Sequence, residues 1–250
     1  MKVNSLIKIL DVLKTGDQLT TDSGAVRNFE LTGLSVAVSA IPAGTQGGDF
    51  HGIIELDGYH TAVFIGDIAG HDFSSSILAT RVIRYIEDNR EKLLHPHLFL
   101  RTMNGDLFKE LSAVGRFFTS AICVVDTAVG RIMYASAGHP PGLLLRADSG
   151  NMVEVGIKAM PLGFEREVSF QSVTTEFLPG DRLLMYTDGV SGARSAGKEE
   201  LGQHRLEDLL RSSRGSAAET VLKVVEYAGR FGQGGPDTDD RTVVCINATG

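Results

Sequence analysis

The sequence predicts a layered α+β fold with antiparallel sheets, and three features predict it. Strand-like segments come first along the chain, two helical segments follow, and strands, a helical pair and a last strand complete the order. Turn dipeptides separate several of the strand-like segments, which favours hairpin connections. The 250 residues are 42% hydrophobic and 22% charged, enough for one substantial core. We therefore expect one large domain with at most a short appendage.

The N-terminal segment differs in pattern from the rest of the chain. Residues 3–14 repeat apolar positions at helical spacing, and a polar, turn-rich stretch follows as far as Asn28. We divide the chain into a helical lead-in, residues 1–30, and a main domain, residues 31–250. The helix has two interpretations, a cap packed on the domain or a contact surface for a homodimer or a regulator, and packing is the commoner use of such a stripe.

The main domain opens with strands. Residues 34–38 alternate in polarity, and residues 52–56 and 60–67 flank Asp57-Gly58 in the pattern of a hairpin. Asp49 and Asp67 are then expected at one end of neighbouring strands. Helices are expected at 74–94, 96–111, 202–212 and 217–231. Further strands are expected at 118–126, 130–137, 142–146, 169–177, 182–186 and 242–247.

Charge and composition exclude several classes of function. The net charge is −7 and no run of Lys or Arg is present, so nucleic acid is a poor ligand. Lys8 and Asp11 interrupt the N-terminal apolar residues, and no apolar run is long enough to span a bilayer. Cys123 and Cys245 lie in apolar strand-like runs, where a thiol behaves as a small hydrophobe. A cytoplasmic protein without membrane contact fits these features.

Acidic residues beside glycine carry the chemistry. The chain has 29 glycines, and four motifs place one or more aspartates beside a glycine, another aspartate or the end of an apolar strand. They are Gly47-Gly48-Asp49, Gly66-Asp67-Ile68-Ala69-Gly70-His71, Thr187-Asp188-Gly189 and Asp237-Thr238-Asp239-Asp240-Arg241-Thr242. Magnesium and manganese prefer such oxygen ligands, and two cations about 3.5 to 4 Å apart can activate a shared water.

A plainer interpretation applies to each aspartate taken singly, because Asp-Gly is a common turn dipeptide. Asp57, before Gly58, lies where a hairpin turn is expected and is assigned no function. Four acidic motifs that each adjoin an apolar strand are harder to explain as independent turns.

These motifs, in this order, resemble the metal-dependent protein phosphatase (PPM) family, specifically its bacterial SpoIIE/RsbU-like branch. The resemblance runs from about Leu31 to Asn247. Besides the acidic motifs it includes Phe118-Thr119-Ser120-Ala121, Ala135-Ser136-Ala137-Gly138-His139-Pro140-Pro141, Pro161-Leu162-Gly163 and Leu178-Pro179-Gly180-Asp181-Arg182-Leu183-Leu184.

The resemblance implies a four-layer α-β-β-α sandwich, with two antiparallel sheets flanked by helices, and makes residues 31–250 a PPM-type phosphatase domain. It also implies two Mn²⁺ or Mg²⁺ ions in a cleft at one end of the sandwich. The catalytic aspartates would be Asp49, Asp67, Asp188 and Asp239, all as metal ligands. The Ile68 carbonyl and, ranked below Asp239, the Asp240 carboxylate would complete the ligand set.

Two departures from the family pattern concern the leaving group and the phosphate. Ala69 stands where many relatives outside this branch have a histidine, which leaves water, His71 or another group to protonate the leaving oxygen. No arginine precedes Gly47 in the manner of eukaryotic relatives, so phosphate would be held mostly by metals and their waters. His139, in a Gly-His-Pro-Pro turn, is expected to be structural.

The function implied is hydrolysis of phosphoserine or phosphothreonine on a regulatory protein by a hydroxide that bridges the two metals. Substrates in this branch are commonly anti-sigma-factor antagonists of the STAS class, in partner-switching or stressosome pathways of signal transduction and stress response. Two rival hypotheses are a catalytically inactive binding module with the same fold and a two-metal hydrolase acting on nucleotides or phosphodiesters.

Overall fold

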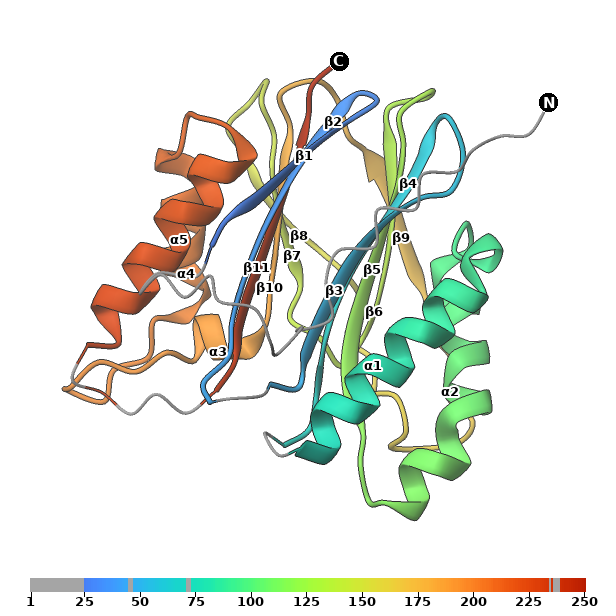
Figure 1. The fold of residues 1–250 in the computed structure, drawn as a ribbon. Helices are drawn as coiled ribbons and strands as arrows, with labels where there is room; N and C mark the ends of the chain where they lie inside the picture. Colours follow the sequence, from blue (N-terminus) through green and yellow to red (C-terminus); the bar gives the residue numbers. More distant parts are fainter. Residues whose placement is uncertain (1–24, 45–46, 71–72, 234, 236–238) are drawn as a thin grey trace.

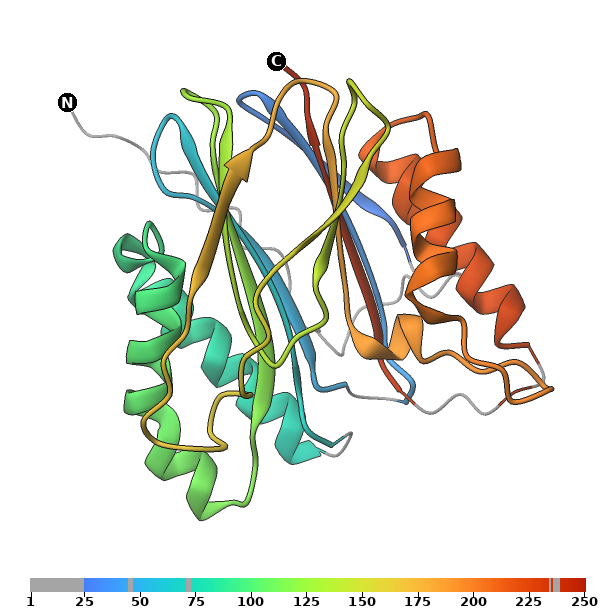
Figure 2. The ribbon, with the colours of Figure 1, turned by 180° about the vertical axis from the view of Figure 1, so that it is seen from behind.

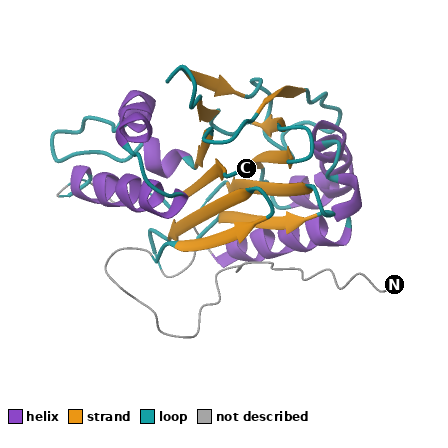
Figure 3. Ribbon diagram, turned by 90° about the horizontal axis from the view of Figure 1, so that it is seen from above, coloured by secondary structure: helices purple, strands orange, loops and turns teal. Residues whose placement is uncertain are grey.

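Two antiparallel sheets pack face to face, and each carries helices on its outer face (Figure 1). The computed structural model describes residues 25–44, 47–70, 73–233, 235 and 239–250. Seen from above, helices flank the two sheets on both sides (Figure 3). The predicted α+β sandwich is therefore confirmed. The predicted N-terminal helix at residues 3–14 lies outside the described residues and remains a prediction, whereas residues 27–30 of the predicted lead-in are part of the strand Arg27–Leu31.

The six-stranded sheet has the order β1-β2-β11-β10-β7-β8, and every neighbouring pair is antiparallel. Its strands are β1 Arg27–Leu31, β2 Leu34–Ile41, β7 Gly142–Leu145, β8 Met152–Val155, β10 Arg182–Tyr186 and β11 Arg241–Ala248. The last strand of the chain, β11, pairs with β2, which lies near the start of the domain. The two ends of the domain therefore lie side by side in one sheet.

The five-stranded sheet has the order β3-β4-β5-β6-β9 and is also antiparallel. Its strands are β3 Asp49–Glu55, β4 His60–Ile68, β5 Phe118–Asp126, β6 Arg131–Ala137 and β9 Ser172–Glu176. The reverse view shows β9, the gold arrow, at one edge of this sheet (Figure 2).

Helices cover the outer faces of both sheets. The helices are α1 Phe73–Asp88, η1 Arg90–Lys92 and α2 Pro96–Ala113 on the five-stranded sheet, and α3 Asp188–Ser191, α4 Gly202–Ser212 and α5 Ala217–Phe231 on the six-stranded sheet. Both predicted C-terminal helices have the predicted bounds. A capping box, in which Ser216 and Glu219 each accept the other's backbone N–H, starts α5 sharply.

Apolar side chains of the central strands are buried on both faces, because successive residues of a strand point to opposite sides. Val36 and Val38 of β2 lie in the core between the sheets, whereas Ala37 packs toward α5. In β5, Cys123 faces the other sheet and Ile122 faces the helices. Cys123 and Cys245 are free and buried, as predicted for small hydrophobes. No helix among the described residues is long and apolar enough to cross a bilayer.

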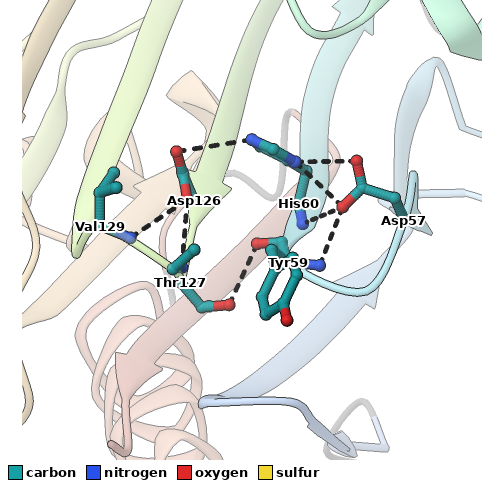
Figure 4. A network of polar contacts seen from close by, with 7 residues as sticks. Asp57, Tyr59, His60, Asp126, Thr127 and Val129 are labelled. Carbon is teal, nitrogen blue, oxygen red and sulfur yellow. Dashed lines mark hydrogen bonds and ion pairs between the residues drawn. The ribbon is translucent and has the colours of Figure 1, made fainter.

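The β3–β4 hairpin turns where the sequence predicts. Asp57 Oδ1 accepts the backbone N–H of Tyr59 at 2.8 Å and that of His60 at 2.9 Å, which is the hydrogen bonding of an Asx turn (Figure 4). The His60 ring lies between Asp57, at 2.9 Å, and Asp126, at 3.5 Å. Asp57 is thus a turn residue, in agreement with its assignment as a residue without catalytic function.

The predicted elements differ from the structure mainly at polar segments. The helix predicted at 74–94 ends at Asp88, because Asn89 leaves helical geometry with φ −120° and ψ 22°. Strands β1 and β8 are edge strands whose partly exposed residues lack a clear apolar pattern, so neither was predicted. The predicted strand at 169–177 is shorter, covering Ser172–Glu176.

Candidate metal centre

Asp49 and Asp67 lie side by side at one end of the five-stranded sheet. Asp49 is the first residue of β3, Asp67 is the last but one of β4, and the two are direct partners in the antiparallel register. This confirms the predicted placement of these two acids at one end of neighbouring strands. The hairpin turn at Asp57 is at the opposite end of the same strands.

Oxygen atoms gather beside the bare backbone of Gly48. A Cβ on this residue would lie 2.6 Å from the Ile68 carbonyl oxygen, 3.0 Å from the Gly70 carbonyl oxygen and 3.1 Å from Asp67 Oδ1. Any side chain here would therefore displace these oxygens. The glycine keeps open the space next to the Ile68 carbonyl.

Asp188 and Asp239 come from the other sheet. Asp188 is the first residue of α3, directly after β10, and Asp239 lies just before β11. Gly189 allows the two segments to touch, because a Cβ there would lie 1.9 Å from the Asp240 carbonyl oxygen and 3.1 Å from the Asp239 Cβ. The segments that carry Asp188 and Asp239 are thus in contact, although α3 was not predicted from the sequence.

Two threonines join the sheets at this end. Thr187 Oγ1 donates to Asp49 Oδ2 at 2.9 Å, and Thr242 Oγ1 donates to the same oxygen at 2.7 Å. Both hydroxyl groups are buried and belong to the six-stranded side, whereas Asp49 belongs to the other sheet. These threonines were not predicted as site residues. Their positions inside the two acidic motifs were the available signal.

The Asp240 carboxylate accepts hydrogen bonds from the backbone. Its Oδ1 accepts the Ala43 N–H at 2.8 Å and its Oδ2 accepts the Gly48 N–H at 2.6 Å, and the side chain is buried. The carboxylate therefore anchors the segment that leads into Asp49. Its assignment as a direct ligand remains a prediction.

Burial and mutual repulsion dominate the electrostatics of the site. Burial, together with the negative charges of Asp49, Asp188, Asp239 and Asp240, raises the pKa of Asp67 to about 9. Burial likewise raises the pKa of Asp49 to about 8, against the lowering effect of its two threonine donors. The acids predicted from separate motifs therefore share one electrostatic region.

The donor set fits hard divalent cations. Several carboxylates and one carbonyl oxygen meet where like charges repel, and a divalent cation would neutralise that repulsion. Within the described part of the chain no three acidic, histidine or cysteine side chains already enclose a single ion position. Asp49 and Asp67 are direct register partners, and Gly189 lets the segments that carry Asp188 and Asp239 touch.

A cavity of about 620 Å³ adjoins Asp188 and Asp239. Its lining also includes Arg194 after α3, Gln233 after α5 and Arg241, the first residue of β11. Arg194 pairs with Glu200 at 2.7 Å. Neither arginine was predicted as a site residue, since nothing in their spacing in the sequence places them beside the acids.

His139 lies in the same end of the five-stranded sheet. Its Nδ1 is 2.9 Å from the Thr119 hydroxyl, and Thr119 is the register partner of Asp67 on β5. Burial lowers the pKa of His139 to about 3, so the ring is neutral in the folded protein near neutral pH. A buried, hydrogen-bonded imidazole agrees with the structural role predicted for it.

The sandwich places this chain among proteins of the PPM phosphatase fold. The fold is similar to that of the catalytic domain of the serine/threonine protein phosphatase PstP in complex with two manganese ions. The TM-score is 0.66 at 18% identity, over 87% of this chain and 99% of the other.

Within that class the chain belongs to the SpoIIE family, because the family model described as Stage II sporulation protein E matches residues 57–249. It is 29% identical over 146 residues to phosphoserine phosphatase RsbP of Bacillus subtilis, covering 57% of this chain and 36% of RsbP. It is 23% identical over 191 residues to phosphoserine phosphatase RsbU of the same organism, covering 76% of this chain and 56% of RsbU. The chain therefore spans about a third to just over half of these relatives.

Proposed function

We propose that this chain is a metal-dependent protein phosphatase that hydrolyses phosphoserine or phosphothreonine. One observation carries the proposal: Asp49 and Asp67 are register partners in one sheet, and Thr187 and Thr242, from the acidic motifs of the other sheet, both donate to Asp49. Membership of the SpoIIE family and the likeness to two phosphoserine phosphatases support the same reaction.

Two Mn²⁺ or Mg²⁺ ions would be held by Asp49, Asp67, the Ile68 carbonyl, Asp188 and Asp239. Bound there, the ions supply charge neutralisation for the phosphoryl group and an acidified water as nucleophile. The two manganese ions of the similar PstP structure support this number.

The remaining groups of the site would position Asp49 and bind the phosphorylated substrate. Thr187 and Thr242 hold one oxygen of Asp49 and leave its other oxygen for a cation. Arg194 and Arg241 line the adjoining cavity and offer positive charge beside the acids. Such charge suits a phosphoryl group or acidic residues next to it.

The substrate class follows from kinship. We propose a phosphorylated STAS-class anti-sigma-factor antagonist, acting in the cytoplasm in a partner-switching or stressosome pathway. The resemblance of the acidic motifs to the SpoIIE/RsbU-like branch supports this class, as do the two Bacillus relatives.

Phosphate release from a phosphorylated antagonist tests the reaction. We expect wild-type activity that requires Mn²⁺, and a loss on the order of 100-fold in Asp67→Asn and Asp188→Asn, because each removes a ligand charge. Asp57→Asn is the matched control, since this acid forms a turn at the other end of the sheet. Full activity in Asp67→Asn and Asp188→Asn would refute the site, and manganese binding without turnover by the wild type would favour the binding module.

A further inference from the structure

We propose that Arg116 is a positioning residue for the segment Ile68–Gly70, which carries one of the candidate metal ligands; the inference rests on the proposed function. Arg116 lies between α2 and β5, outside every acidic motif. Its guanidinium Nη1 donates to the Ala69 carbonyl, and Nη2 donates to Ser74 Oγ at 3.2 Å. One side chain thus connects the end of β4 to the first turn of α1.

Gly70 leaves the room that this contact needs. Its backbone has φ +101°, and a Cβ at this position would lie 1.9 Å from Arg116 Nη1. The guanidinium therefore lies directly against the bare backbone of the segment. The positive φ of Gly70 and its missing side chain support the close approach of Arg116 independently of the hydrogen bonds.

The orientation of the Ile68 carbonyl follows from peptide geometry. The Ile68 carbonyl and the Ala69 N–H belong to one planar trans peptide group and point in opposite directions. The Ala69 N–H donates to the Phe117 carbonyl at 3.0 Å, and the Ala69 carbonyl accepts from Arg116. Residues 116 and 117 thus hold both sides of Ala69, so the Ile68 oxygen stays directed at the space beside Gly48.

The fork shape of the guanidinium matters more here than its charge. Two nitrogens of one rigid plane reach two acceptors, Ala69 and Ser74, which a lysine ammonium cannot match with the same geometry. Removing a group that hydrogen-bonds to a metal ligand and orients it typically weakens metal binding by about 10- to 100-fold. Arg116 is expected to act in this way.

Calorimetric titration of the full chain with Mn²⁺ tests the role. We expect Arg116→Ala to weaken manganese binding by roughly 10-fold and Arg116→Lys to lie between Ala and wild type. Arg84→Ala is the matched control, because Arg84 is an exposed arginine on α1 whose Nε lies 3.9 Å from Asp88 Oδ2. Its manganese affinity is expected to equal that of the wild type.

The conservative variant keeps the inference testable if Arg116→Ala does not fold, because lysine retains the charge and the aliphatic stem. Wild-type manganese affinity in a folded Arg116→Ala, or in Arg116→Lys when the alanine variant does not fold, would overturn the positioning role. If the wild type binds manganese and releases phosphate, and these variants have the same manganese affinity as the wild type, only this inference is refuted. A wild type that does not bind manganese refutes the proposed function instead.

Discussion

Three aspartates beside glycine show how surroundings decide a residue's role. The pKa values of Asp49 and Asp67 are raised by burial, whereas the pKa of Asp57 is lowered, mainly by the Tyr59 backbone N–H. All three stand out in the sequence. Their positions along the hairpin distinguish them, because Asp57 lies at its turn and Asp49 and Asp67 lie at its open end. The threonine donors to Asp49 and the contacts of Arg116 could not be predicted, because they depend on how two distant strands pack.

His139 gives the protein a pH dependence that can be measured. Its pKa is about 3 when folded and about 6.5 in an ordinary setting, so below pH 6.5 the unfolded chain binds a proton that the folded protein does not. Above about pH 6.5, protonation of His139 takes nothing from the free energy of unfolding. As the pH falls from 6.5 toward 3, the free energy of unfolding decreases by up to about 1.4 kcal/mol per pH unit. Urea unfolding at several pH values is expected to show this slope.

The variant His139→Asn is the comparison for that slope. Removing the titrating group should flatten the acid side of the stability curve relative to wild type, even if the variant is less stable at neutral pH. Parallel curves for the two proteins between pH 6.5 and pH 4 would contradict a buried, neutral His139.

At the level of elements, amphipathic helices and apolar strands were predictable and polar edges were not. The bounds of α4 and α5 follow from periodicity, and a capping box also marks the start of α5. Strands β1 and β8 were missed because an edge strand contacts a neighbour on one side only and needs fewer apolar residues. The four-residue helix α3 is too short for periodicity to show.

The β3–β4 hairpin permits a test that separates stability from metal binding. Asp57→Ala removes the carboxylate that accepts two backbone N–H groups, which should cost about 1 kcal/mol of unfolding free energy. Because the turn is at the far end of the strands from Asp49 and Asp67, manganese affinity should not change. Thermal unfolding and calorimetry on one preparation measure both. A weakened manganese affinity would show that the turn and the site are coupled.

At the scale of the whole molecule, the site exists only because two sheets meet. Asp49 and Asp67 belong to one sheet, and Asp188 and Asp239 adjoin strands of the other. The threonine bonds to Asp49 and the backbone bonds to Asp240 tie the two layers together at this end. The sandwich therefore both forms the candidate site and fixes its geometry.

Anomalous diffraction from crystals grown with Mn²⁺ tests this arrangement most directly. We expect two manganese peaks about 3.5 to 4 Å apart, in contact with Asp49, Asp67, Asp188 and Asp239. Crystals that bind no manganese among these four carboxylates, or bind it only elsewhere on the protein, would contradict the account.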